Sequence, residues 1–156
     1  MSEFAYLGDC PLFQGLSLEQ RAAVYGLCEL ALYAEGETIF SEGDASDLVF
    51  VVCEGHVRIS IQTSGAGEEA LAICGPGDPF GEVDLLSDEP AARSANAIAH
   101  TACELATLSR AALLELTERD PELGYRLARN AITGLGERIR RTNQKLRFFA
   151  AANLFG

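Results

Sequence analysis

Gly81, Glu82, Arg93 and Ser94 lie within one short segment, and their types suit the binding of a small polar molecule. Gly81 allows backbone N–H groups to approach a ligand closely, and the Glu82 carboxylate can accept from a hydroxyl group. The Arg93 guanidinium is a planar fork that matches two oxygens of a phosphate. Ser94 adds a hydroxyl and an N–H beside it. These residues together predict a receptor for a small anionic nucleotide.

The remaining reactive residue types do not form a second recognisable site. His56 and His100 do not combine with other residues into a nucleophilic triad or a metal triad, and paired catalytic carboxylates are not evident. Cys53 stands three residues before His56, and His100 three before Cys103, a spacing that could bind zinc. Because each pair borders a predicted hairpin turn, the pairs need not meet. We therefore expect no metal, no cofactor and no enzymatic activity.

The composition indicates one globular core. The chain has 156 residues, of which 48% are hydrophobic. It contains neither a signal-peptide pattern nor an apolar stretch near the roughly 20 residues of a membrane span, which predicts a cytoplasmic protein without membrane contact. The cysteines fall mostly in apolar runs and are interpreted as reduced core residues; they are Cys10, Cys28, Cys53, Cys74 and Cys103.

Charge is distributed unevenly along the chain. Residues 1–125 carry 5 Lys and Arg against 22 Asp and Glu, whereas residues 126–156 carry 7 against 1. The acidic part repels nucleic acid, so we expect no direct DNA binding. The basic part is either a solvated face that complements the acidic part or a surface for an acidic partner.

The order of predicted elements indicates a mainly β fold with flanking helices. Pro11 begins a short helical entry, and Ser17 with Gln20 fits a capping box for a helix that reaches about Leu27. Short runs rich in Val, Ile and aromatic residues then alternate with Gly and Asp turns, as in a sandwich or barrel. The predicted strands are Glu29–Ala34, Thr38–Phe40, Leu48–Cys53, Val57–Gln62, Ala70–Cys74, Ser94–Ala99 and Cys103–Thr107.

The pattern becomes helical after Ser109, first to about Glu118 and then from Pro121 towards the C-terminus. We expect residues 1–120 to form the β unit with its N-terminal helices, and residues 121–156 a long helix. Alternate spacings of three and four favour a helix that pairs with a second copy in a homodimer, and packing on its own β unit is the alternative. The seam residues are Ile132, Leu135, Ile139, Thr142, Leu146, Phe149 and Asn153.

An ordered set of motifs resembles the cyclic nucleotide-binding domain family from about Leu12 to at least Leu127. The resemblance implies a β-roll or jelly-roll with flanking helices and a long C-terminal helix, and a phosphate-binding cassette between two strands. The motifs occur in the family's order and are Phe13–Ser17, Gly36–Phe40, Glu42–Asp44, Asp47–Gly55, Gly77–Asp78 and Phe80–Glu82.

The resemblance assigns roles to the cassette residues. Glu82 and the Gly81 backbone would hold the ribose 2′-hydroxyl, and Arg93 would pair with the cyclic phosphate. Ser94 would contact the same phosphate, and Ala95 completes an Arg-Ser-Ala segment that is similar to the bacterial activator branch. A structural Glu82–Arg93 salt bridge in a domain without a ligand is the alternative.

Two departures from the family pattern affect the expected ligand contacts. Glu82 and Arg93 are eleven positions apart, longer than usual in the family, so the loop around Pro90 must bulge. Activators of the family present hydroxyl groups to adenine from the long helix, where this chain has Arg138 and Ile139, with Thr142 one turn further on. Arg138 could stack on a purine or donate to guanine, or be a solvated surface residue.

The resemblance implies a sensor that binds cyclic AMP, or less favourably cyclic GMP, and transmits binding through the C-terminal helix to an unknown downstream partner. The chain ends near the point where activators begin their helix-turn-helix, so no recognition helix is expected. The alternative is a scaffold for protein interaction that binds no nucleotide, or a different one such as a cyclic dinucleotide.

Overall fold

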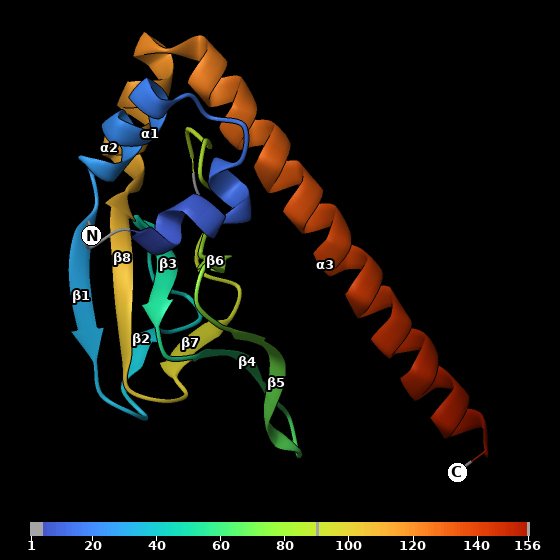
Figure 1. Cartoon of the computed structure of the whole chain (residues 1–156). Helices are drawn as coiled ribbons and strands as arrows, with labels where there is room; N and C mark the ends of the chain where they lie inside the picture. The colour runs from blue at the N-terminus through green and yellow to red at the C-terminus, as the bar shows by residue number, and fades with distance from the viewer. Residues whose placement is uncertain (1–4, 90, 156) are drawn as a thin grey trace.

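The computed structural model describes residues 5–89 and 91–155, which form two antiparallel sheets, with helices Leu18–Tyr25 and Arg110–Arg119 and the start of the long C-terminal helix at one end (Figure 1). This arrangement confirms the predicted mainly β fold with a long C-terminal helix. The elements are η1 Ala5–Asp9, η2 Pro11–Phe13, α1 Leu18–Tyr25, β1 Glu29–Tyr33, β2 Thr38–Phe40, β3 Leu48–Glu54, β4 Val57–Thr63, β5 Gly67–Cys74, β6 Pro79–Phe80, β7 Asn96–Ala99, β8 Cys103–Ser109, α2 Arg110–Arg119 and α3 Pro121–Phe155.

The two sheets enclose one part of the core, and the helices enclose the other. One sheet has the strand order β1-β8-β3-β6, and the other has the order β2-β7-β4-β5. Side chains alternate along β3, so Phe50 and Val52 face the second sheet while Val49 and Val51 pack beneath the helices. Both faces of β3 are covered, which agrees with the nearly continuous apolar sequence of this strand.

The helix termini follow their local sequence signals. The Ser17 hydroxyl accepts from the Gln20 N–H, and the Gln20 side chain accepts from the Ser17 N–H, which confirms the predicted capping box. The helix ends at Tyr25, two residues earlier than expected, with Gly26 as its C-cap. Strand β6 was not predicted, because two residues are too few to show a periodic pattern; Phe80 pairs with Phe50 of β3.

Helix α3 has a buried start and an exposed remainder. Leu123 and Leu127 are fully buried beside α2 and the N-terminal helices. The helix then runs past the strands, and residues 137–153 are all exposed (Figure 1). The side chains of Ile132, Ile139 and Leu146 on the predicted seam are 60% exposed or more. In the part of the chain that the structure describes, no helix combines the length and apolarity that a membrane crossing needs.

Candidate functional site

The predicted site lies on the segment between β6 and β7, which we call the cassette (residues 81–95, with Pro90 outside the described residues). It begins with Gly81 at a positive φ of 73°, a conformation that favours glycine. A turn follows, in which the Leu85 N–H donates to the Glu82 carbonyl at 3.0 Å. At its far end, the Arg93 N–H donates to the Asp44 carbonyl at 2.8 Å, which ties the cassette to the β2–β3 turn.

Arg93 is buried and held by backbone oxygens and an aromatic ring. Its Nη1 donates to the Gly81 carbonyl at 3.0 Å and its Nη2 to the Leu48 carbonyl at 2.6 Å. The guanidinium carbon lies 4.2 Å from the centroid of the Phe40 ring, within cation–π distance. Its Nε is buried and makes no hydrogen bond to a described residue. The Nε–H group of this cation is therefore buried without an acceptor among the described residues.

Glu82 is buried as well, and its two oxygens have different surroundings. Oε1 accepts from Arg138 Nη2 at 2.8 Å, an ion pair between the cassette and α3. Oε2 is buried without a hydrogen-bond partner among the described residues. The carboxylate thus pairs with Arg138, not with Arg93 as the structural salt bridge would require.

Burial and neighbouring charges oppose each other at Arg93. Burial lowers the pKa of the guanidinium, because removal from water disfavours the charged form. Nearby carboxylates of Asp84, Asp47, Asp44 and Glu82 act in the opposite direction and raise that pKa. Since arginine stays protonated in proteins, the result is a buried cation surrounded by acidic groups.

The other predicted contact residues are less enclosed than Glu82 and Arg93. Ser94 is exposed and Ala95 half-buried, and both lie in a bend directly before β7, which begins at Asn96 and not at Ser94. Thr142 is exposed on α3, one turn beyond Arg138. The structure therefore brings Gly81, Glu82, Arg93 and Arg138 together, whereas it leaves Thr142 apart from their hydrogen bonds.

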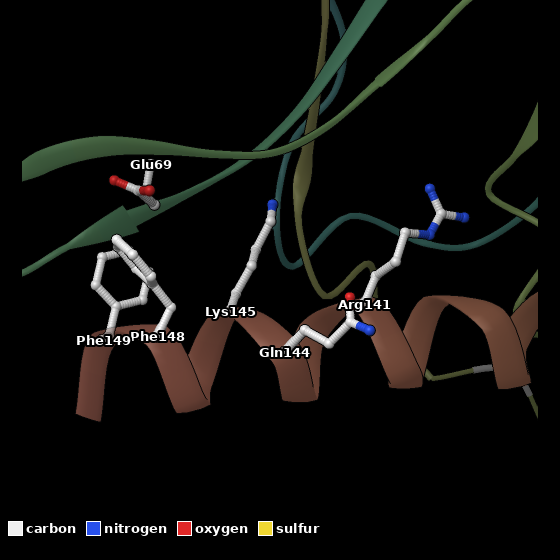
Figure 2. Close-up of a pocket in the computed structure, with 6 residues that line it drawn as sticks. All are labelled: Glu69, Arg141, Gln144, Lys145, Phe148 and Phe149. Carbon is white, nitrogen blue, oxygen red and sulfur yellow. The ribbon is translucent and has the colours of Figure 1, made fainter. Parts of the chain in front are cut away.

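Two cavities lie between α3 and the β unit. One has a volume of about 240 Å³ and separates the cassette turn from the start of α3, with Glu82, Leu86 and Ile132 among its lining residues. Arg93 does not line it. The other, of about 390 Å³, lies between β5 and the far half of α3, where Arg141 and Lys145 extend towards the strand (Figure 2). No sequence pattern had indicated this second cavity.

Several groups that hold the cassette were not predicted. Phe40 supports Arg93 from β2, although the sequence had indicated it only as the end of a predicted strand and of a family motif. The Arg110 side chain at the start of α2 donates to the Ser87 carbonyl. The aromatic residues Phe40, Phe50 and Phe80 pack together, with the rings of Phe50 and Phe80 stacked at 4.9 Å. Such partners are distant in sequence, so no local spacing reveals them.

The turns that contain the two Cys–His pairs lie side by side. The His100 N–H donates to the His56 carbonyl at 2.9 Å. Cys53 nevertheless packs beneath the helices and Cys103 between the sheets, on opposite faces of the same sheet. Within residues 5–89 and 91–155, no group of three or more His, Cys, Asp or Glu side chains could hold a metal ion, and the five cysteines are free thiols.

Comparisons with known proteins agree on one family. Residues 31–120 match the family model described as the cyclic nucleotide-binding domain. The chain is 37% identical over 118 residues to the cyclic AMP receptor protein of Thermus thermophilus, covering 76% of this chain and 54% of that protein. It is 30% identical over 140 residues to a CRP-like cAMP-activated global transcriptional regulator of Mycobacterium tuberculosis, covering 90% and 60%. The chain thus spans little more than half of these two relatives.

Solved structures show the same similarity. The catabolite activator protein of Thermus thermophilus superimposes with a TM-score of 0.74 at 34% identity, covering 90% of this chain and 63% of that one. The N-terminal domain of a transcriptional regulator from Streptomyces coelicolor has a TM-score of 0.73 at 32% identity, covering 90% and 94%. The second match extends over almost the whole of that N-terminal domain.

Proposed function

Since this chain belongs to the cyclic nucleotide-binding domain family, we propose that it is a non-enzymatic sensor that binds a cyclic nucleotide in the cassette and relays binding through α3. The five free cysteines agree with a cytoplasmic setting, where thiols stay reduced. Cyclic AMP is favoured over cyclic GMP as the ligand, because the relatives named above are described as cyclic AMP receptors or cAMP-activated regulators.

The observation that carries the proposal is a pair of unused polar atoms inside the cassette. Arg93 Nε is a buried donor and Glu82 Oε2 a buried acceptor, and neither has a partner among the described residues. Buried polar atoms without partners are rare because each costs about 1–3 kcal/mol. A cyclic nucleotide carries a phosphate that accepts and a sugar hydroxyl that donates, which are the two kinds of partner that these atoms lack.

The two terminal nitrogens of Arg93 can also serve a phosphate. Each carries two N–H groups, of which one donates to a carbonyl, that of Gly81 or that of Leu48. A phosphate oxygen carries negative charge, and hydrogen bonds between charged groups are roughly twice as strong as neutral ones. A phosphate is therefore a favourable acceptor for the other N–H groups, and the adjacent Ser94 can add its hydroxyl to the same phosphate.

The relay follows from the Glu82–Arg138 ion pair, which joins the ligand site to α3. A ligand shifts an equilibrium between two arrangements only if it binds them with different affinity. Because the same carboxylate faces both the predicted sugar and the helix, binding can change the position of α3. The exposed seam on α3 then offers a surface for a second copy, which supports the proposed homodimer.

Isothermal calorimetry with cyclic AMP and cyclic GMP tests the proposal directly. We expect Arg93→Ala to weaken binding by about 2–5 kcal/mol, hence roughly 30-fold to several thousand-fold, because the phosphate loses a buried charged partner. Arg119→Ala is the matched control, since that arginine is exposed and pairs only with Glu115.

Arg93→Lys tests whether lost binding reflects only lost folding, because it keeps a cation over the Phe40 ring. It should melt close to the parent and still bind weakly. Parent protein that binds neither nucleotide below about millimolar, or Arg93→Ala with unchanged affinity, would contradict the assignment.

A scaffold without a nucleotide is the second candidate, and one observation favours it. Both Nη atoms of Arg93 and one oxygen of Glu82 already have protein partners, so much of the cassette is closed by its own contacts. Thermal melting separates the two candidates. Ligand at 100 times its dissociation constant adds about 2.7 kcal/mol, whereas melting that stays constant across cyclic mononucleotides and dinucleotides favours the scaffold.

A further inference from the structure

The cavity between β5 and the far half of α3 contains no cassette residue in its lining. It has a volume of about 390 Å³ and is lined by Glu69, Arg141, Gln144, Lys145, Phe148 and Phe149. This volume lies within the range of about 300–1,000 Å³ that is usual for small-molecule sites. The cavity is therefore large enough for a ligand of its own, separate from the nucleotide.

The α3 side of this cavity combines two cations with two aromatic rings, and their side chains extend from the helix towards the strands (Figure 2). They stand at positions i, i+4, i+7 and i+8, which lie on one face of a helix, and are Arg141, Lys145, Phe148 and Phe149. The two rings meet edge to face at 5.9 Å, and the residues are 71% and 53% exposed. An apolar platform therefore lies about one helical turn, about 5.4 Å, from Lys145.

On the β5 side, a β-bulge supplies the acceptor that positions Lys145. The register of β4 with β5 shifts beside Ile59, which leaves Leu71 as the extra residue of the bulge. The Lys145 Nζ donates to the Leu71 carbonyl at 3.0 Å. This contact uses one of the three N–H groups of the ammonium. Lys145 is thus held over the cavity with two N–H groups left for a ligand.

Glu69 and Arg141 give the cavity opposite charges at its two ends. The neighbouring Glu68 pairs with Arg58, whose Nε lies 2.6 Å from the carboxylate. Among the residues that the structure describes, neither Glu69 nor Arg141 forms an ion pair. Glu69 lies beside the two rings, and Arg141 lies beyond Lys145 along α3 (Figure 2). The cavity therefore offers an acceptor beside the rings and cationic donors at the other end.

We propose that this cavity binds an aryl acid, by which we mean a small molecule with a planar aromatic ring, an O–H or N–H donor on that ring, and a carboxylate or phosphate about one helical turn away. The ring packs against Phe148 and Phe149, and its donor faces Glu69. The anionic group accepts from Lys145 and Arg141. One ligand thus complements each group of the cavity. Because no cassette residue takes part, this inference goes beyond the proposed function and does not rest on it.

Titrations followed by NMR chemical shifts test the inference with four probes. 4-Hydroxyphenylacetate has the ring, the donor and a carboxylate, and 4-hydroxyphenyl phosphate has a phosphate instead. Phenylacetate lacks the ring donor, and 4-hydroxyphenylethanol lacks the charge. At least one complete probe should bind with a Kd below about 1 mM. The two incomplete probes should bind at least about 10-fold more weakly, because each loses a hydrogen bond to a charged group. The tighter complete probe identifies the anionic group.

Two variants assign the two ends of the ligand. Glu69→Ala should weaken 4-hydroxyphenylacetate about 10-fold without weakening phenylacetate, since only the first has a donor for the carboxylate. Lys145→Met should weaken both acids about 10-fold and leave 4-hydroxyphenylethanol unchanged. Arg147→Met is the matched control, because Arg147 is an exposed cation of α3 outside the lining of the cavity. It should bind every probe as the parent does.

Cyclic AMP and Arg93→Ala separate this cavity from the cassette. The acid should bind to Arg93→Ala as it does to the parent, and cyclic AMP should not compete with it. Competitive displacement by cyclic AMP would place the acid in the cassette and overturn the inference. A parent that binds neither complete probe below about 1 mM would also overturn it, as would unchanged affinities in both Glu69→Ala and Lys145→Met.

A second copy is the other possible occupant of this surface, because Phe149 also belongs to the predicted seam of α3. Replacement of Ile139 and Leu146 by glutamate removes the pairing of two copies, and the acid should bind to this variant and to the parent alike. Binding that appears only in the variant would show that a second copy covers the cavity, and would overturn the inference. Protein that binds the acid but no cyclic nucleotide would contradict the proposed function alone.

Discussion

Gly81 shows how one backbone position controls the buried charge of the cassette. It has a φ of 73°, and a Cβ placed there would lie 2.7 Å from Arg93 Nη1 and 3.4 Å from the Leu48 carbonyl oxygen. Any side chain would therefore meet both the arginine and one of its acceptors. Glycine at this position is required by the conformation and by the close approach of the guanidinium.

Gly81→Ala should lower both stability and ligand affinity, and Gly36→Ala is its matched control. Gly36 has a similar φ of 82°, but a Cβ there would meet nothing within 4 Å. Both variants incur the conformational cost of a positive φ, about 1–3 kcal/mol. Only Gly81→Ala should additionally displace Arg93 and weaken nucleotide binding, by about 10-fold or more. Urea denaturation and calorimetry measure the two effects, and equal affinities in the two variants would contradict the role of Gly81.

Buried thiols should make the stability of the fold depend on pH in the alkaline range. Burial raises the pKa of Cys10 and of Cys28 from 9.0 to about 12. The native thiols then stay protonated at a pH where the unfolded ones ionise, so stability is fully present below pH 9 and decreases above it. The expected slope is about 1.4 kcal/mol per pH unit for each such thiol.

Chemical denaturation at pH 8, 9 and 10 measures this slope. Cys28→Ala should reduce the slope by the contribution of one thiol, since alanine does not ionise. A free energy of unfolding that stays constant between pH 9 and pH 10 would show that these thiols ionise equally in both states.

At the scale of elements, Asn130 of α3 forms two hydrogen bonds to the N-terminal helical segment. Its Nδ2 donates to the Leu12 carbonyl at 2.8 Å and to the Gln14 carbonyl at 2.9 Å. The Leu12 carbonyl belongs to η2 and the Gln14 carbonyl directly follows it, so the Asn130 side chain caps the end of that short helix. The start of α3 is held by this contact and by buried leucines, whereas its far half is exposed.

Asn130→Ala should lower the free energy of unfolding by about 1–3 kcal/mol, because two carbonyls lose their donor. Asn143→Ala is the control, since Asn143 is exposed on the same helix. Urea denaturation of both variants gives the difference directly. A loss in Asn130→Ala no larger than in Asn143→Ala would mean that the two hydrogen bonds contribute nothing net.

For the molecule as a whole, the predicted seam of α3 leaves apolar side chains exposed. Ile139, Leu146 and Phe149 are 60%, 61% and 53% exposed. These residues recur at the spacing that lets two helices pack along a shared stripe. Pairing with a second copy would remove this surface from water and explain its apolar character.

Replacement of Ile139 and Leu146 by glutamate should convert the proposed dimer to a monomer, because the charges would be buried at the seam. Gln144→Glu adds a charge on the other side of α3 and should leave the assembly unchanged. Light scattering gives the molar mass of each protein. If the parent protein is already monomeric, the proposed pairing of two copies along the seam is wrong.

Local sequence was sufficient to identify the helix caps, most strands and the segment that carries Glu82 and Arg93. Capping depends on residues three apart, strands depend on alternation over a few residues, and the cassette residues lie within one loop. Each of these signals is short-range, so each can be recognised without knowledge of the fold. The exception was β6, whose two residues are too short for a pattern.

Tertiary structure alone decided which partners these residues have. Arg93 meets Phe40 and the Leu48 carbonyl, and Glu82 meets Arg138, all through segments distant in sequence. Such contacts depend on how sheets and helices pack, which leaves no periodic trace in the chain. The same packing leaves Arg93 Nε and Glu82 Oε2 buried without hydrogen-bond partners among the described residues. Residue types therefore predicted a polar site. The contact of that site with α3 depends on how the helix docks on the β unit.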